Sequence, residues 1–74
     1  MNKKDIIDKW VYIKGNQDIA YKIIRIYYNV DSTFKAELNT NTGVCAYEPL
    51  TNLIFITDIV KVHELETERI HNGL

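Results

Sequence analysis

Apolar and polar side chains alternate without a break from residue 33 to residue 38, in the order Thr-Phe-Lys-Ala-Glu-Leu. Successive side chains of a β-strand point to opposite faces, so this pattern predicts a strand that lies between a core and water. The expected inward residues are Phe34, Ala36 and Leu38, and the expected outward residues are Thr33, Lys35 and Glu37. Such half-buried strands favour a small all-β domain.

Four other segments between residues 10 and 57 have the composition of strands, because they are rich in β-branched and aromatic residues. They are Trp10–Lys14, Ile19–Tyr28, Val44–Glu48 and Asn52–Thr57. Residues 60–63 alternate again, with Val60 and Val62 expected to face inward. A one-turn 3₁₀ connector is predicted at residues 57–59, with Asp58 as its cap. Strands at this spacing are typical of a small sandwich or barrel.

The two ends of the chain are predicted to be short additions to a core of residues 10–63. Residues 2–9 include the pair Ile6 and Ile7, which a single helical turn could pack against the mouth of a barrel. Residues 64–74 are polar and rich in Glu, and we expect a short helix or a tail there. The 74 residues are therefore expected to form one domain.

The pattern of strand lengths resembles the SH3-like barrel superfamily over residues 10–63. The features that carry the resemblance are the strand at 10–14, a polar loop, the long pair 19–28 and 33–38, the strands at 44–48 and 52–57, and the connector before 60–63. The resemblance implies a five- to six-stranded antiparallel barrel. An OB-like barrel is the alternative fold, although it normally inserts a longer helix between strands.

Charge and cysteine content restrict the class of partner. Nine Lys and Arg residues balance ten Asp and Glu residues, so the formal net charge is −1. This balance argues against a protein whose affinity depends on neutralising many phosphates. Cys45 is the only cysteine, which excludes an internal disulfide. We expect a cytoplasmic chain without a membrane partner, because no apolar run has the length of a signal peptide or a membrane span.

The motifs that carry chemistry are missing from the sequence. It contains no Gly-rich phosphate loop, no nucleophile elbow and no zinc-type cysteine pairing. A minor enzyme is one hypothesis, in which folding would bring together Cys45, Glu48 and His63, but their spacing does not support it. If residues 63–71 were helical, Glu64, Glu68 and His71 would share a face, although not at the spacing of a zinc protease motif. We expect no enzyme activity, cofactor or metal.

Aromatic residues give the strongest signal for binding, since five Tyr, two Phe and one Trp occupy 74 positions. If Ile24 and Ile26 point inward, the alternate residues of the same strand line an outer face. The predicted binding residues are Tyr21, Ile23, Arg25 and Tyr27, together with Lys35 of the next strand. Tyr and Arg combine a large contact area with a polar group. The competing interpretation is that this strip is half of a small core or is covered by the chain ends.

Two functions fit this strip. The first is a small non-enzymatic binding module, whose partner is a protein, a peptide or a second copy of the chain. Self-association would supplement the marginal core of so small a domain. The alternative is a nucleic-acid or nucleotide binder, which the positive excess in the first half of the chain favours. One form of it is an oligomer that holds small nucleotides between subunits, as a phage or mobile element could encode.

Overall fold

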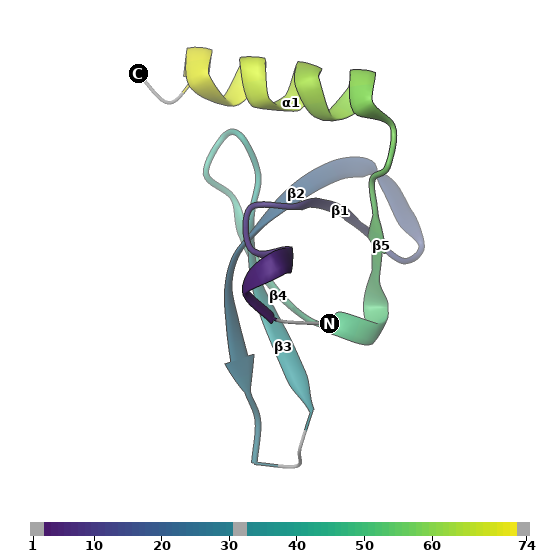
Figure 1. Ribbon diagram of the computed structural model, residues 1–74, viewed down its shortest axis with the longest axis vertical. Helices are drawn as coiled ribbons and strands as arrows, with labels where there is room; N and C mark the ends of the chain where they lie inside the picture. Colours follow the sequence, from purple (N-terminus) through teal and green to yellow (C-terminus); the bar gives the residue numbers. More distant parts are fainter. Residues whose placement is uncertain (1–2, 31–32, 73–74) are drawn as a thin grey trace.

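The described residues form five strands, one α-helix and two 3₁₀ helices (Figure 1). The computed structural model describes the backbone of residues 3–30 and 33–72, and the side chains of residues 5–30 and 33–68. In chain order the elements are η1 (Lys3–Ile6), β1 (Trp10–Ile13), β2 (Asn16–Tyr28), β3 (Phe34–Asn39), β4 (Cys45–Pro49), η2 (Leu50–Asn52), β5 (Leu53–Phe55) and α1 (Ile59–Asn72). The chain is therefore mostly sheet, as the alternating pattern predicted.

The strands of the described chain form one antiparallel sheet in the order β4-β3-β2-β1-β5. The last strand lies beside the first, while β4 and β5 are the two edges of an open sheet. This pairing confirms the five strands predicted between residues 10 and 57. Closure into a barrel is not shown, because β4 and β5 each pair with one neighbour.

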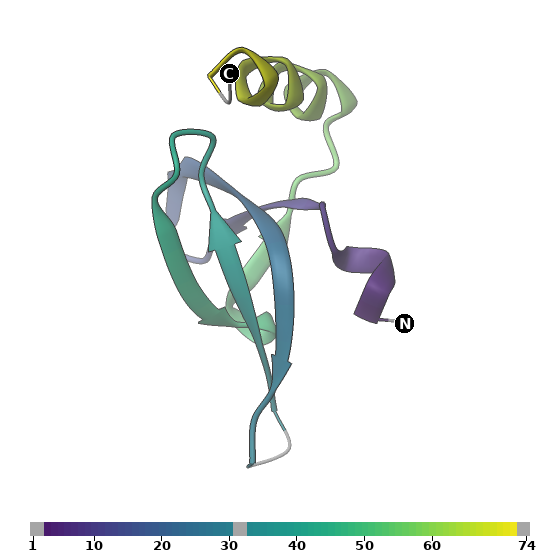
Figure 2. The same ribbon diagram turned by 90° about the vertical axis from the view of Figure 1, so that its left-hand side faces the viewer.

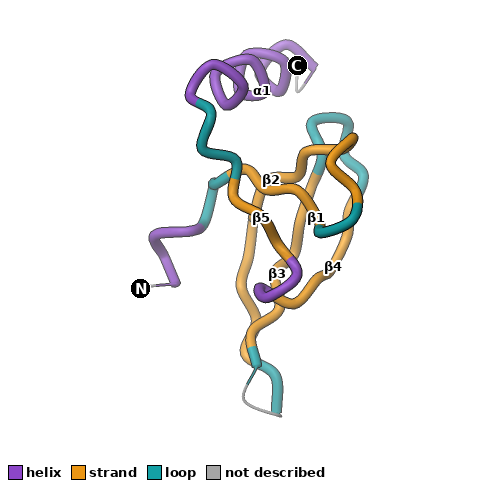
Figure 3. Tube along the Cα trace, turned by 90° about the vertical axis from the view of Figure 1, so that its right-hand side faces the viewer, coloured by secondary structure: helices purple, strands orange, loops and turns teal. Residues whose placement is uncertain are grey.

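The other elements lie around this sheet. Figures 1 and 2 show α1 across one end of the sheet, beside the β3–β4 turn, and the β2–β3 hairpin extending from the other end. Figure 3 places η1 and β4 on opposite sides of the molecule. Ile6 of η1 is buried in the core and Ile7 packs against it, which confirms the predicted N-terminal turn. The N-terminal helix η1 thus lies away from the edge strand β4.

The prediction of a final strand at residues 60–63 is wrong, because these residues belong to α1. The Asp58 carboxylate accepts hydrogen bonds from the backbone N–H groups of Val60 at 3.0 Å and Lys61 at 3.3 Å, so it caps the first turn of the helix. The alternation at Val60 and Val62 spans too few residues to separate a strand from a helix. The predicted 3₁₀ connector is also misplaced, since η2 precedes β5 instead.

A bulge in β2 changes which side chains of the strand face the core. Ile23 pairs with Leu38 and Arg25 pairs with Glu37, so Ile24 is an extra residue in the ladder. Before the bulge the odd-numbered residues face inward, and Tyr21 and Ile23 are 7% and 0% exposed. Beyond it Ile26 packs against the core, whereas Arg25 and Tyr27 are exposed. The prediction that Tyr21 and Ile23 line an outer face is therefore wrong, whereas the outward position of Arg25 is confirmed.

The core lies on the inner face of the curved sheet, where β1, β2, β3 and β5 meet η1. Its buried residues are Ile6, Val11, Tyr21, Ile23, Ala36, Leu38 and Leu53. The alternation of residues 33–38 is confirmed by β3, since Ala36 and Leu38 are fully buried. Ile26 packs against this cluster from beyond the bulge.

Candidate functional site

Five side chains of three neighbouring strands gather on one side of the sheet. Antiparallel pairing sets Arg25 of β2 opposite Glu37 of β3, and Glu37 opposite Tyr47 of β4. Tyr27 of β2 pairs in the same way with Lys35 of β3. Directly paired residues project to the same face, so these five form one surface, which we call the outer face. The rings of Tyr27 and Tyr47 are exposed there, at 38% and 51%.

Polar and aromatic contacts hold the outer face in one arrangement. The Tyr27 hydroxyl donates a hydrogen bond of 2.6 Å to Glu37 Oε1. The rings of Tyr27 and Tyr47 lie 6.5 Å apart between centroids with a tilt of 43°, which is a favourable aromatic geometry. The Lys35 ammonium lies 5.7 Å from the centroid of the Tyr47 ring, within the range of a cation–π contact. The surface thus presents two rings between charges of both signs.

The same contacts raise the pKa of two groups on the outer face. The hydrogen bond to Glu37 raises the pKa of Tyr27, because ionisation would remove the donor and place a second negative charge beside the carboxylate. The pKa of Arg25 is raised as well, first by its hydrogen bond and its charge interaction with Tyr27 and then by the nearby charge of Glu37. Both shifts favour the protonated form, so near neutral pH Tyr27 stays neutral and Arg25 stays charged, as at their ordinary pKa values.

The outer face contains three of the five residues that the sequence predicted for binding. Arg25, Tyr27 and Lys35 lie together, whereas Tyr21 and Ile23 are in the core. Sequence reasoning missed Glu37 and Tyr47 as members of this surface. The alternation of β3 already placed Glu37 outward, but the side of Tyr47 depends on the register of β4, which no local pattern reveals.

A second group of contacts fastens α1 to the sheet. Trp10 Nε1 donates a 2.7 Å hydrogen bond to Glu66 Oε1, and Lys22 Nζ lies 3.0 Å from the same oxygen. The Lys22 ammonium also lies 3.9 Å from Asp8 Oδ1 and 5.8 Å from the centroid of the Trp10 ring. Leu65, which precedes Glu66 in the helix, is buried as well. These contacts define the position of α1 over one end of the sheet.

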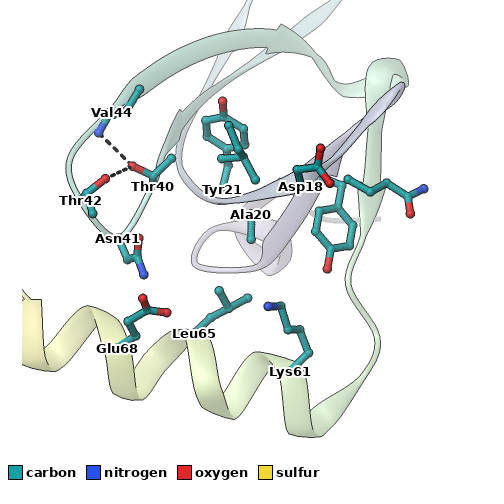
Figure 4. Close-up of a pocket in the computed structure, with 13 residues that line it drawn as sticks. Asp18, Ala20, Tyr21, Thr40, Asn41, Thr42, Val44, Lys61, Leu65 and Glu68 are labelled. Atoms are coloured by element: carbon teal, nitrogen blue, oxygen red, sulfur yellow. Dashed lines mark hydrogen bonds between the residues drawn. The ribbon is translucent and has the colours of Figure 1, made fainter.

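A cleft of about 370 Å³ lies between α1, β2 and the β3–β4 turn (Figure 4). Its lining includes Lys61, Leu65 and Glu68 of α1, Asp18, Ala20 and Tyr21 of β2, and Thr40, Asn41, Thr42 and Val44 of the turn. The Thr40 hydroxyl accepts a hydrogen bond from the Val44 backbone N–H at 3.0 Å and lies 3.1 Å from the Thr42 hydroxyl. These bonds hold the turn that forms one wall of the cleft.

The residues considered for catalysis and metal binding do not form a site in the described part of the chain. Cys45 and Glu48 lie on β4 and His63 lies on α1, and no hydrogen bond or ion pair between described groups joins them. Among the described side chains, no group of three or more His, Cys, Asp or Glu residues could hold a metal ion. The side chain of His71 lies outside the described residues.

The chain matches no protein-family model, no curated protein and no solved structure. Over the described residues, none of the helices has both the length and the apolar character needed to cross a membrane.

Proposed function

We propose that this chain is a small non-enzymatic protein-binding module that uses the outer face, and that its first partner is a second copy of itself. The observation that supports this most directly is the exposure of Tyr27 and Tyr47 side by side on paired strands, with Arg25 and Lys35 around them. Exposed aromatic rings with an Arg are the residue types that dominate the binding energy of protein interfaces.

Self-association suits the charges of this surface. In a two-fold dimer the same patch meets itself, so it must carry groups that complement each other. Arg25 and Lys35 supply positive charge and Glu37 supplies negative charge, and all three lie on adjacent strands. Burial of two tyrosine rings from each copy would add apolar contact to a domain whose own core is small.

We also propose that the domain is an SH3-like barrel. Two features support the proposal: the position of β5 beside β1 in the sheet, and the 3₁₀ helix η2 directly before the last strand. A cytoplasmic location belongs to the same proposal, since the exposed thiol of Cys45 is free and suits a reducing compartment.

Sedimentation velocity at increasing protein concentration tests the proposed self-association. The native chain is expected to approach twice the monomer mass, while Tyr47→Ala is expected to stay monomeric with an unchanged circular-dichroism spectrum. Tyr28→Ala is the matched control, because Tyr28 is 62% exposed on the same sheet but lies outside the outer face. A native chain that stays monomeric at every concentration, or a Tyr47→Ala variant that still dimerises, would contradict the proposal.

Single-stranded nucleic acid is the second candidate partner, because bases stack on tyrosine rings and phosphates bind to Arg and Lys. The proximity of the Lys35 ammonium to the Tyr47 ring favours it. Fluorescence anisotropy with a labelled oligothymidylate tests this candidate. Binding should weaken as salt is raised and should be lost in Tyr47→Ala. Affinity that is independent of salt, or no binding at low salt, would exclude it.

A further inference from the structure

We propose that the cleft beneath α1 is a second binding site, separate from the outer face, for a small zwitterion of the α-amino-acid type. Three α1 residues, Lys61, Leu65 and Glu68, follow one another at helical spacing and so share one face of the helix. Figure 4 shows this face directed toward Asp18 and Asn41 on the opposite wall. The cleft therefore has a charged wall on each side.

The charges in the cleft do not satisfy one another. Lys61, Asp18 and Glu68 all line it, yet none of them makes an ion pair with a described side chain. The Lys61 side chain is half-buried, and a half-buried ammonium gains from an anionic partner. Glu68 and Asp18 are exposed and line the cleft, so they can accept hydrogen bonds from a cation.

The rest of the lining mixes polar residues, such as Thr40 and Asn41, with an apolar part that includes Leu65, Tyr21 and Ala20. Leu65 and Tyr21 are 6% and 7% exposed, and Figure 4 shows Ala20 between them. This surface can receive an aliphatic side chain, whose burial is favourable. The volume of about 370 Å³ is within the usual range for small-molecule sites.

The arrangement selects a ligand with both charges. A simple anion would be attracted to Lys61 but repelled by Asp18 and Glu68, and a simple cation would meet the opposite problem. A neutral apolar molecule would remove water from three charged groups without replacing their hydrogen bonds. An α-amino acid offers its carboxylate to Lys61, its ammonium to the carboxylates, and its side chain to Leu65.

The walls of the cleft are held in place before any ligand binds. Glu66 fastens the middle of α1 to Lys22 and Trp10, and the Thr40 hydroxyl braces the β3–β4 turn through Val44. A preformed site loses less free energy to ordering when it binds. The contacts that fix α1 on the sheet thereby also shape the cleft.

The test is a titration of the native chain with L-leucine, followed by ¹H–¹⁵N NMR. We expect saturable shifts at the amides of Lys61, Leu65 and Asn41. N-acetyl-L-leucine and L-leucine amide, which each lack one charge, are expected to bind about tenfold more weakly. Leucyl-leucine distinguishes a free amino acid from a peptide end, because its charges are farther apart and it should bind more weakly.

Variants assign the binding to the cleft. Lys61→Gln and Glu68→Gln are each expected to weaken L-leucine binding about tenfold. Lys14→Gln is the matched control, since Lys14 is exposed and does not line the cleft. Tyr47→Ala should leave L-leucine binding unchanged, which separates this site from the outer face.

Two results would overturn the proposal. The first is the absence of saturable shifts with L-leucine. The second is equal binding by the acetylated or amidated forms, or by Lys61→Gln. Each variant replaces a side chain that is exposed or half-buried, and a native-like NMR spectrum checks that it is folded.

Discussion

Ile24 is the residue at which β2 changes its faces. It is the extra residue between the pairs Ile23–Leu38 and Arg25–Glu37, so it separates a core-facing segment from an outward-facing one. The composition of β2 gave no sign of this bulge, because Ile occurs at positions 23, 24 and 26 and fits either face. The sequence therefore predicted that Arg25 and Tyr27 face outward, but not that the bulge at Ile24 places Tyr21 and Ile23 in the core.

Alanine substitutions at neighbouring isoleucines test the bulge. Ile23→Ala removes a side chain that is 0% exposed and should lower the free energy of unfolding by about 2–5 kcal/mol. Ile24→Ala removes a half-buried side chain and should cost about 1 kcal/mol. Urea denaturation of the two variants measures the difference. Equal losses, or a larger loss for Ile24→Ala, would be incompatible with an inward Ile23.

The hydrogen bond between Tyr27 and Glu37 predicts an unusual tyrosine titration. Tyr27 should ionise at a pKa above the ordinary value of about 10, and Glu37→Gln should move it back. Because the folded-state pKa is raised, the bond stabilises the fold below the unfolded-state pKa and is lost as pH rises through the folded-state pKa. Ultraviolet absorbance of tyrosinate follows this titration, with Glu64→Gln as the control. A Glu37→Gln curve identical to the native one would refute the assignment.

At the scale of elements, the strands were predictable, whereas α1 was predicted only in part, as a short helix or a tail within residues 64–74. Alternation over six residues predicted β3, and the turn residues on either side of it predicted where the adjoining strands end and begin. The start of α1 carries Ile59, Val60 and Val62, which favour strands. The Asp58 cap, the hydrogen bond of Glu66 and the burial of Leu65 favour the helix instead. The hydrogen bond of Glu66 joins residues far apart in the sequence, so no local pattern reveals it.

The attachment of α1 through Glu66 can be tested with the single tryptophan of the chain. Glu66→Ala removes the partner of Trp10 Nε1 and Lys22, so the emission of Trp10 should shift to longer wavelength and the amides of α1 should exchange faster. The cost in stability should be about 1 kcal/mol, since Glu66 is partly exposed.

Glu64→Ala is the matched control for the same helix. Its side chain is exposed and makes no contact with Trp10, so its emission and exchange should match those of the native chain. A Glu66→Ala variant with native emission and native exchange would mean that α1 is held by other contacts.

At the scale of the whole molecule, two surfaces compete for a partner. The outer face combines tyrosine rings with charges on three paired strands. The other candidate is a set of apolar residues of β5 and the start of α1 that are exposed between 36% and 83%, namely Ile54, Phe55, Ile59 and Val60. It spans β5 and the first turn of α1, which residues 56–58 connect without regular structure. The outer face lies entirely on paired strands, and a preformed surface binds at lower entropic cost.

The measurement that tests the central claim most directly is a dilution series of ¹H–¹⁵N NMR spectra of the native chain. If the outer face is the binding surface, the amides that shift with concentration should cluster at Arg25, Tyr27, Lys35 and Tyr47. Shifts that cluster instead at the apolar surface of β5 and α1, or spectra that do not change with concentration, would contradict it.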